Sequence, residues 1–390
     1  MIHDMKNLIK KIKGVINAVI FIIINRVLCF FTKVEEKKVL FASDVRSGTG
    51  GNYSFILEWL AGKGYEVIYD FKADRRVKRG LRGSLALVYK MTISGSILLE
   101  DYFRYITFMK VRKGQQICQL WHGAGAFKKF GFSRAAENEG IRIHKGYRKY
   151  AKAIVSAEEI RGCYAEAFRI PKENVRATGI PRTDIFFDEK YIAGKKEELI
   201  KEFPVFEKKK VILFAPTYRG VRAEDAAYDF DMLDLKKLYY DLNEEHVFVF
   251  KWHPAAYNNI MMNNREVYDL KKYGDFFLDL SWDRDINDLL LVTDILITDY
   301  SSVIFDYLLV DRPIVYYPYD LAAYEAGRGL YYDYEAYLYG TVAMDQKELT
   351  DAIKAGDMCS QKREAFRKHF MEACDGHSTE KTCRWFFEEE

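Results

Sequence analysis

The chain has 390 residues, of which 49% are hydrophobic and 30% charged, and its net charge is +3. This composition is typical of a globular protein long enough for two domains, and it excludes a low-complexity chain. Residues 71–150 carry 18 Lys or Arg against 5 Asp or Glu, whereas residues 151–390 carry 32 against 45. The basic region therefore predicts an anionic partner, which could be nucleic acid, an acidic membrane surface or a phosphorylated substrate. The six cysteines lack a CxxC pair and metal-ligand spacing, so we interpret them as reduced thiols of a cytosolic protein.

The chain begins with four lysines within its first 13 residues, followed by an apolar run over 15–31 that Arg26 interrupts. No small-residue cleavage site follows the run, which argues against a cleaved signal peptide. Arg26 also leaves the apolar stretch short of the ~18–20 residues that a membrane span needs. We expect residues 1–34 to form a helix in the interface of an anionic leaflet, on the cytoplasmic face of the cell membrane. A helix packed on the protein's own core is the alternative.

Strand-like and helix-like segments alternate from residue 38 onward. In the first series, a glycine-rich turn at 46–53 and a helix at 54–64 follow the first strand. A charge-rich helical segment at 191–210 opens a second series. The strands are predicted at or within 39–43, 65–71, 115–123, 152–157 and 174–179, and then 210–220, 246–254, 275–281, 294–302 and 313–320. This alternation predicts parallel sheets with crossover helices.

The resulting fold is α/β, with two doubly wound Rossmann-type domains that face a cleft. We expect the membrane-associating segment 1–34, a first Rossmann-type domain at 35–187 and a second at 188–358. Helices at 359–390 are expected to pack back on the first of these domains. Ligands of such open sheets gather beyond the carboxyl ends of the strands, so the residues at these ends are the candidates for function.

Ser301 and Ser302 stand where the apolar strand 295–298 stops and an amphipathic helix starts. In the first turn of a helix, backbone N–H groups lack internal partners and the helix dipole is positive. Such a position holds either a helix cap or an anion, typically a phosphate. The serine pair alone leaves both interpretations open.

Two histidines also follow strands. His122 ends an apolar run and precedes glycines, which let the backbone approach a ligand closely, and the basic pair Lys128-Lys129. His253 ends a second apolar strand. A histidine at such a place can act as a general base toward a hydroxyl, and a structural role is the alternative for either one alone. Two of them in separate domains, together with the serine pair, favour function.

Other motifs give weaker evidence of function. The glycine-rich turn is not a GxGxxG fingerprint, and the chain contains no GxxxxGK[ST]. The acidic pairs in 229–231 and 283–285 lie in polar stretches, where such pairs are usually only solvated, so we expect no metal site. The basic region has no helix-turn-helix or RNA-recognition signature, so we expect no nucleic acid partner.

Seven segments stand out together over residues 115–385: WHG…FKKFG (121–131), GIPRTD (179–184), FAPTYRG (214–220), KWHP (251–254), TDYSSVIFDYLLVDRPIVYYPYD (298–320), GRGLYYDY (327–334) and DGHST (375–379). This set resembles the CDP-glycerol glycerophosphotransferases of teichoic acid synthesis, and the short chain is similar to the primase-type members. The family often has HGT followed by proline where this chain has HGAG, so the acceptor stays open. CDP-ribitol enzymes share most of these motifs, so the donor polyol stays open as well.

The resemblance implies a GT-B-like fold and transfer of glycerol phosphate from CDP-glycerol to a hydroxyl of a polyprenyl-diphosphate-linked precursor, with release of CMP. His122 would deprotonate the acceptor, and His253 would stabilise charge on the donor diphosphate. The donor-binding candidates are Thr217, Arg219, Lys251, Ser301, Ser302, Asp306 and Arg328. The acceptor-side candidates are Asn52, Gly123, Lys128 and Lys129. No metal or other cofactor is expected, because displacement at phosphorus needs mainly positioning and charge stabilisation.

We therefore expect a membrane-associated enzyme that transfers a polyol phosphate, most simply glycerol phosphate. Transfer of ribitol phosphate from CDP-ribitol is the nearest alternative. A GT-B glycosyltransferase that uses a nucleotide sugar, and a non-catalytic polymer-binding protein of the same fold, are the others. The basic, aromatic-rich surface also leaves a homo-oligomer open.

Overall fold

The computed structural model describes residues 2–72, 77, 79–137, 145–220, 226–263, 266, 268–282, 285–356 and 359–389, apart from some helical side chains, among them those of residues 6–11 and 325–328. The chain forms two compact units. Unit 1 comprises Met1–His122, Phe130–Arg182 and His377–Glu390, and unit 2 comprises Gly123–Lys129 and Thr183–Gly376. Each unit is described by itself.

Unit 1 contains a six-stranded parallel sheet with the strand order β2-β1-β3-β4-β5-β6. Its strands are β1 (Glu35–Ser43), β2 (Glu66–Phe71), β3 (Ser94–Leu99), β4 (Gln116–Gln119), β5 (Lys152–Val155) and β6 (Val175–Ala177). The central strand β3 is buried over its whole length, as a strand covered on both faces of a parallel sheet must be. The sequence patterns predicted five of these strands but not β3.

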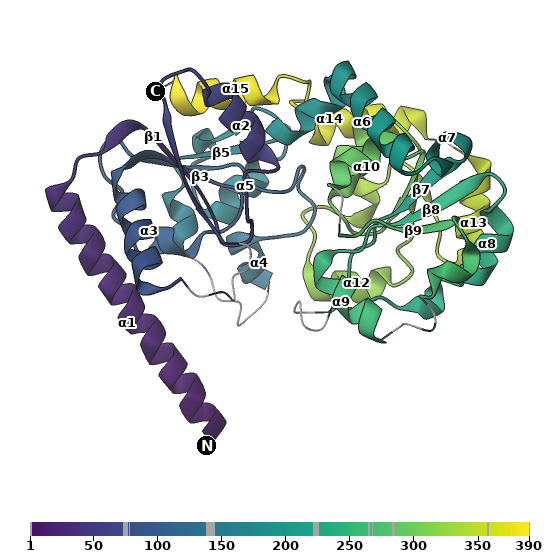
Figure 1. Cartoon of the computed structure of the whole chain (residues 1–390), viewed down its shortest axis with the longest axis horizontal. Helices are drawn as coiled ribbons and strands as arrows, with labels where there is room; N and C mark the ends of the chain where they lie inside the picture. The colour runs from purple at the N-terminus through teal and green to yellow at the C-terminus, as the bar shows by residue number, and fades with distance from the viewer. Residues whose placement is uncertain are drawn as a thin grey trace. The chain divides into compact units, whose positions relative to one another are not determined.

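Helices cover the faces of this sheet. They are α2 (Asn52–Leu60), α3 (Leu81–Ile93), α4 (Gly131–Glu137), α5 (Arg161–Phe168) and α15 (Ser378–Phe387), with short 3-10 turns at Arg104–Thr107, Lys145–Lys149 and Lys172–Asn174. The C-terminal helix α15 lies beside α2 (Figure 1). The indole N–H of Trp59 donates to Glu380 at 2.6 Å, and the Trp59 ring stacks on Phe387. The end of the chain thus completes unit 1, as expected for the last helix.

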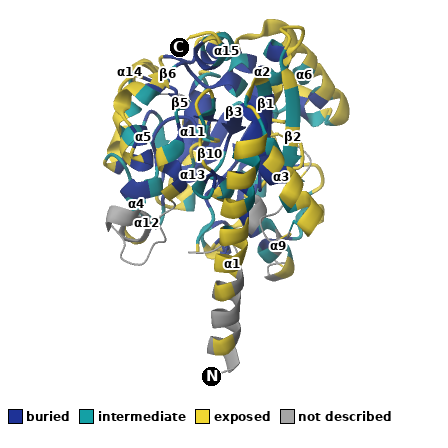
Figure 2. Ribbon diagram, turned by 90° about the vertical axis from the view of Figure 1, so that its left-hand side faces the viewer, coloured by how far each residue is buried: buried dark blue, intermediate teal, exposed yellow. Residues whose placement is uncertain are grey.

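The N-terminal helix α1 (Ile2–Phe31) has two different halves. Its C-terminal half packs on unit 1 through the buried ring of Phe21 and through Asn25, which is fully buried. The side chain of Asn25 donates to the hydroxyl of Thr92 at 2.9 Å and accepts from the backbone N–H of Lys110 at 2.7 Å. Much of the rest of the described helix is exposed (Figure 2).

By length and composition, residues Gly14–Phe31 could cross a membrane, and 11% of this window is buried. We expected Arg26 to rule out such a length, but the 18-residue window tolerates it. The helix is therefore long and apolar enough to span a membrane, although Asn25 ties it to unit 1.

Unit 2 contains a second six-stranded parallel sheet with the order β12-β11-β10-β7-β8-β9. Its strands are β7 (Lys210–Phe214), β8 (His246–Phe250), β9 (Phe277–Asp279), β10 (Ile295–Thr298), β11 (Ile314–Tyr316) and β12 (Thr341–Val342). Its helices are α6 (Glu189–Glu202), α7 (Val205–Lys208), α8 (Leu235–Leu242), α9 (Pro254–Asn263), α10 (Ile286–Val292), α11 (Val303–Leu308), α12 (Leu321–Arg328), α13 (Gln346–Ala355) and α14 (Ser360–Phe370), with 3-10 turns at Pro181–Phe187, Phe230–Met232, Leu270–Tyr273 and Tyr334–Tyr337.

The local sequence explains where several of these helices begin. An aspartate side chain accepts a backbone N–H of the first turn at the start of α6, α8, α10 and α13; these caps are Asp188, Asp234, Asp285 and Asp345. Such a cap satisfies a donor that has no partner inside the helix. In α8 the buried residues Leu235, Leu238 and Leu242 recur at helical spacing and face the core. The two parallel sheets confirm the predicted pair of doubly wound α/β domains.

The last two helices do not share a unit, contrary to our expectation that both pack on the first domain. The aromatic rings of Phe366 and Phe370 in α14 lie against Phe305 of α11, and Arg363 pairs with Asp311 at 2.6 Å. These contacts belong to unit 2, and only α15 returns to unit 1. The apolar pattern of α14 predicted a packed helix, but pattern alone cannot say against which sheet it packs.

The loop 123–129, which we expected in the first domain, belongs to unit 2. It pairs with residues 329–331 through backbone hydrogen bonds from Lys129 to Gly329 and from Tyr331 to Phe127. Gly125 has a φ of +67°, and a Cβ on it would lie 2.4 Å from the ring of Phe305 in α11. Only glycine fits this position, because it needs a left-handed backbone and leaves room for the ring.

Candidate functional site

The carboxyl edge of the first sheet presents His122. Strand β4 ends at Gln119, and three residues later the His122 side chain is 53% exposed. Its Nδ1 lies 3.0 Å from Oδ1 of Asp101 and 3.3 Å from the carbonyl oxygen of Glu100. Both acidic residues directly follow β3, the neighbouring strand, so the parallel register brings them to the histidine.

This contact fixes the chemistry of the imidazole. With Nδ1–H directed at Asp101, the Nε2 atom is the one available to accept a proton. Desolvation lowers the pKa of His122, but the hydrogen bond and charge of Asp101, together with Glu100, outweigh it and raise the pKa above the ordinary value. Asp101 therefore orients the imidazole of His122 and favours its protonated form.

Asn52 lies behind His122 and is fully buried at the start of α2. Its Nδ2 donates to the carbonyl oxygen of Trp121 at 3.0 Å, and its Oδ1 accepts from the backbone N–H of Arg182 at 3.0 Å. We expected Asn52 to meet the acceptor, but its burial and these contacts give it an internal role. Sequence spacing could not distinguish the two, since residues 52, 121 and 182 meet only in the folded unit.

Glu100 is buried in the same cluster. Its Oε1 accepts from the backbone N–H of Asn52 at 2.7 Å, and Arg46 Nε lies 2.5 Å from its Oε2. Desolvation raises the pKa of Glu100 to about 7, against the opposing charge of Arg46. The sequence patterns missed Glu100 and Asp101. The signal that could have found them is the apolar run SILL, which an acidic pair ends.

The carboxyl edge of the second sheet is organised around Arg219. Its guanidinium makes two hydrogen bonds to Asp320, at 2.5 and 2.7 Å, and one to Asp299 at 2.7 Å. A further N–H donates to the carbonyl of Thr217 at 2.5 Å, so four of the five N–H groups of the arginine are engaged. Burial opposes its charge, but the two aspartates raise the pKa of Arg219 far above its ordinary value. Arg219 therefore ties together the ends of β7, β10 and β11. These contacts are structural, whereas the resemblance predicted that Arg219 binds the donor.

Thr217 and His253 lie at the same edge. The backbone N–H of Thr217 donates to Asp299 at 2.7 Å, and its side chain is largely buried. His253 is exposed beyond the end of β8, and its ring lies 4.9 Å from the ring of Tyr218. Its carbonyl oxygen accepts the N–H groups of Ala256 and Tyr257 in α9. His253 thus lies exposed at this edge, and its role toward the donor diphosphate stays a prediction.

Lys251, which precedes His253, is engaged inside unit 2. Its ammonium donates to the carbonyl oxygens of Leu280 and Ser281, both at 3.0 Å. These carbonyls follow β9, so the lysine holds the ends of β8 and β9 together. The sequence predicted that Lys251 binds the donor; its observed contacts are structural.

The two serines lie between β10 and α11, as predicted. Ser302 is exposed and makes no side-chain hydrogen bond to the helix that it precedes. The Ser301 hydroxyl lies 3.4 Å from the N–H of Val303, at the limit of a hydrogen bond. A Cβ on Gly123 would lie 3.8 Å from the Ser302 hydroxyl oxygen, so the loop 123–129 reaches the same place. Capping therefore does not account for Ser302.

The remaining candidates fall into three groups. Asp306 is 5% exposed in a helix whose six residues are all buried, which does not support contact with a donor hydroxyl. Lys128 and Lys129 lie on the loop that pairs with residues 329–331, and the ammonium of Lys128 lies 5.4 Å from the centre of the Tyr324 ring. Arg328 ends α12, but its side chain lies outside the described residues.

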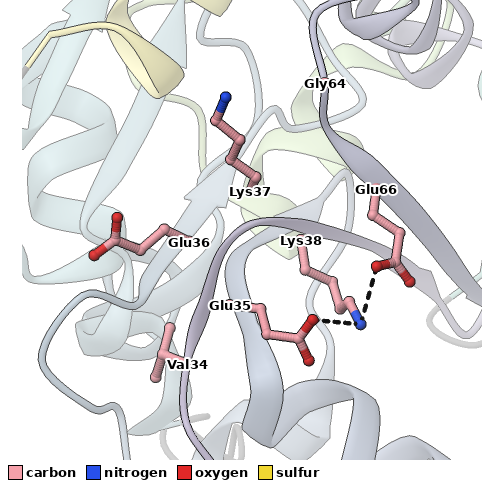
Figure 3. Close-up of a pocket in the computed structure, with 7 residues that line it drawn as sticks. All are labelled: Val34, Glu35, Glu36, Lys37, Lys38, Gly64 and Glu66. Atoms are coloured by element: carbon pink, nitrogen blue, oxygen red, sulfur yellow. Dashed lines mark ion pairs between the residues drawn. The ribbon is translucent and has the colours of Figure 1, made fainter.

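A separate cavity of about 490 Å³ lies at the opposite, amino-terminal edge of the first sheet (Figure 3). Lys38 pairs there with Glu35 at 2.8 Å and with Glu66 at 3.1 Å (Figure 3). Its lining is Val34, Glu35, Glu36, Lys37, Lys38, Gly64 and Glu66. Because the cavity lies at the edge where parallel strands begin, away from the edge at which such sheets bind ligands, we assign it no role.

The fold and the strand ends define the class of protein. It is an α/β protein of two units, each with a parallel sheet and with a histidine just beyond the carboxyl end of one strand. The family model of CDP-glycerol:poly(glycerophosphate) glycerophosphotransferase matches residues 23–388. The solved wall teichoic acid polymerase TagF has a TM-score of 0.73 and 21% identity, covering 100% of this chain and 98% of that chain, which shows a shared fold.

Two curated relatives are also similar. The teichoic acid poly(ribitol-phosphate) polymerase of Bacillus spizizenii is 40% identical over 353 residues, which are 89% of this chain and 56% of that protein. The teichoic acid ribitol-phosphate primase of the same species is 32% identical over 371 residues, which are 91% of this chain and 92% of that protein. The chain thus spans little more than half of the polymerase and nearly all of the primase.

The chain belongs to the CDP-glycerol glycerophosphotransferase family, as the sequence motifs predicted.

Proposed function

We propose that the chain transfers a polyol phosphate from a CDP-polyol to a hydroxyl group of a polyprenyl-diphosphate-linked cell-wall precursor. The observation that carries this proposal is the pairing of His122 with Asp101 at the carboxyl edge of the first sheet. It supplies an oriented base with a raised pKa, which is the group that activation of an acceptor hydroxyl requires.

In the proposed reaction, Nε2 of His122 accepts the proton of the acceptor hydroxyl. The acceptor oxygen then forms a bond to the phosphorus that carries the polyol, and the bond from this phosphorus to the bridging oxygen breaks. CMP leaves with that oxygen. The displacement needs charge stabilisation around the phosphoryl oxygens, and the accessible imidazole of His253 and the hydroxyls of Ser301 and Ser302 are the groups of unit 2 suited to it.

The identity of the donor polyol is proposed from the similarity of the chain to named relatives. We expected glycerol from the sequence motifs, and the family description names glycerophosphate. The 40% identical polymerase and the primase that matches nearly its whole length are both named for ribitol phosphate. We therefore propose CDP-ribitol as the first donor to test, with CDP-glycerol as the second. Primase or polymerase behaviour follows from the number of units added.

We also propose that the enzyme is peripheral on the cytoplasmic face of the cell membrane. The exposed apolar residues of α1 and those of α3 at Leu81, Leu85 and Tyr89 are suited to an anionic leaflet. The hydrogen bonds of Asn25 to Thr92 and Lys110 tie α1 to unit 1, and they favour a helix that lies on the membrane over one that spans it. The lysines at 6–13 that we expected to meet lipid headgroups have side chains outside the described residues.

The direct test is acceptor-dependent release of CMP from CDP-ribitol and from CDP-glycerol, with a lipid-linked disaccharide analogue as acceptor. We expect wild type to be active with one donor and His122→Ala and His253→Ala to lose that activity. The matched control is His246→Gln, since His246 is buried at the amino end of β8, the strand that leads to His253. Turnover of a nucleotide sugar instead, or polymer binding with no turnover, would contradict the proposal.

The membrane proposal has its own test. Deletion of residues 1–20 removes the part of α1 that precedes the docked Phe21. We expect the truncated chain to bind the CDP-polyol as wild type does, and to lose activity on acceptor embedded in liposomes. Full activity on liposomes would contradict the proposed membrane role of α1.

A further inference from the structure

We propose that Asn52 is a positioning residue that holds the backbone of Trp121 and thereby aims His122 at the acceptor hydroxyl. This inference rests on the proposed function, because it assigns Asn52 to the step in which His122 is the base. It also replaces the acceptor contact that the sequence predicted for Asn52.

The residue before the histidine has an unfavourable backbone conformation. Trp121 has a φ of +55°, in the left-handed region that a bulky L-residue rarely adopts. Such a conformation persists only where the surroundings hold it. The ring of Trp121 stacks on Phe130 with ring centres 4.6 Å apart, which anchors the side chain and leaves the peptide groups to be held by other residues.

Two amide side chains hold these peptide groups. The N–H of Trp121 donates to Oε1 of Gln119 at 2.9 Å, and its carbonyl oxygen accepts from Nδ2 of Asn52 at 3.0 Å. Gln119 is a local partner two residues away, whereas Asn52 comes from a distant part of the chain. Asn52 is therefore the contact that fixes the turn relative to the rest of unit 1.

Asn52 is itself rigidly placed. Its backbone N–H donates to the buried carboxyl of Glu100, and its Oδ1 accepts from the backbone N–H of Arg182. It thereby joins the residues that follow β3, β4 and β6 at one edge of the sheet. Because Asp101 follows Glu100, the same network that holds Trp121 also fixes the partner of His122.

The loss of this contact should act on catalysis more than on donor binding. Without the Asn52 amide, Trp121 can relax toward negative φ, which would turn the following His122 away from Asp101. A misplacement of about 1 Å in a reacting group can cost on the order of 100-fold in rate. The donor-binding candidates lie in unit 2, so the KM for the CDP-polyol should stay nearly constant.

The pH profile separates positioning from simple stabilisation. The charged groups around His122 are Asp101, Glu100 and Arg182, and the net effect of its surroundings is to raise its pKa. If Asn52 keeps the histidine on Asp101, its removal moves the acid limb of kcat/KM to lower pH. A loss of stability alone would leave that limb in place.

The experiment compares Asn52→Ala and Asn52→Asp with Gln115→Ala. Asn52→Asp keeps the side-chain shape and the acceptor for Arg182, but it replaces the donor to Trp121 with an oxygen. Gln115 is a matched control, because its side-chain amide also holds backbone carbonyls, those of Met91, Thr92 and Ser94. It directly precedes β4, so it lies at the end of this strand opposite to Trp121. Folding is checked by thermal unfolding and by binding of the CDP-polyol.

We expect both Asn52 variants to lose about 10- to 100-fold in kcat, with KM for the CDP-polyol within about twofold of wild type. In Asn52→Ala, which adds no charge, the acid limb should also move to lower pH. Gln115→Ala should lose stability and keep the wild-type pH profile. If Asn52→Ala does not fold, Asn52→Asp carries the test.

The failures are distinguishable. A folded Asn52 variant with the kcat and pH profile of Gln115→Ala would overturn the inference and leave the proposed function intact. Absence of acceptor-dependent CMP release in wild type, with either CDP-glycerol or CDP-ribitol, would overturn the proposed function and the inference with it.

Discussion

The carboxyl edges of the two sheets use buried charge in different ways. In unit 1, buried polar residues surround one half-exposed histidine, and Asp101 contacts it directly. In unit 2, the partly buried Arg219 pairs with the buried Asp299 and with the partly buried Asp320. His253 lies beyond them and is exposed.

This difference separates two kinds of residue near a site. Removing a partner of His122 should change the pH dependence of the reaction, because the partner sets the pKa of the base. Removing a member of the Arg219 cluster should change the stability of unit 2, because the members are partners mainly of each other. The predictions below test this contrast, from the largest expected effect to the smallest.

Arg219→Ala should produce the largest effect. It leaves Asp299, which is 1% exposed, and Asp320 without their shared partner, and a broken buried ion pair costs about 3–5 kcal/mol. Denaturant unfolding measures this loss. The control is Arg312→Ala, whose half-exposed pair with Asp294 should cost about 1 kcal/mol or less. An Arg219 variant as stable as the control would contradict the structural role.

Glu100→Gln should change how stability depends on pH. The pKa of Glu100 is about 7 in the folded protein and 4.5 ordinarily, so the folded state binds the proton more tightly. Its contribution to stability is therefore present below pH 4.5 and lost as the pH rises to about 7, by about 3 kcal/mol. The glutamine variant should lack this loss. Unfolding measured across pH 4–8 tests it, with the exposed Glu66→Gln as a control that should follow wild type.

Asp101→Asn should change the reaction itself. Without the carboxylate, the pKa of His122 falls, so the acid limb of kcat/KM should move to lower pH. Loss of an orienting partner should also lower kcat by about 10- to 100-fold, which corresponds to ~1.4–2.7 kcal/mol. The pH–rate profile of CMP release is the measurement. An unchanged acid limb would show that Asp101 does not set the basicity of His122.

Ser302→Ala should have the smallest effect on stability, within about 0.5 kcal/mol, because its hydroxyl does not cap α11. The same variant should raise the KM for the CDP-polyol several-fold if the hydroxyl meets the donor. Asp345→Ala is the matched control, since Asp345 caps α13 by accepting from Glu348 at 2.9 Å. That variant should lose about 0.5–2 kcal/mol and keep its KM. A capping-sized loss of stability in Ser302→Ala would contradict the donor role.

Much of the fold was predictable because parallel sheets have a strong local signature. Buried apolar strands that end in polar or glycine residues, with amphipathic helices between them, indicated doubly wound domains. β3 was missed: it begins Ser94-Gly95-Ser96, directly at the end of α3, so no loop marks its start. Because β3 was missed, the sequence patterns also missed Glu100 and Asp101, the two acidic residues that follow it and lie beside His122.

The site was predicted in part. The positions of His122, His253, Ser301 and Ser302 at strand ends follow from local pattern, and the structure places all four there. For Asn52, Arg219, Lys251 and Asp306, the family resemblance implied ligand binding, but the structure shows burial or internal partners. Sequence pattern does not reveal whether the hydrogen-bonding capacity of a side chain is already used, because its partners lie far away along the chain.

The sequence by itself determined the class of fold, the strand ends that carry the histidines and the family, since all of these depend on short segments read in order. Only the tertiary structure decided that the loop 123–129 and α14 pack in unit 2, that Asp101 is the partner of His122, and that Asn52 holds the strained Trp121. These features depend on contacts between residues about 20 to 200 positions apart, which periodicity and propensity do not encode.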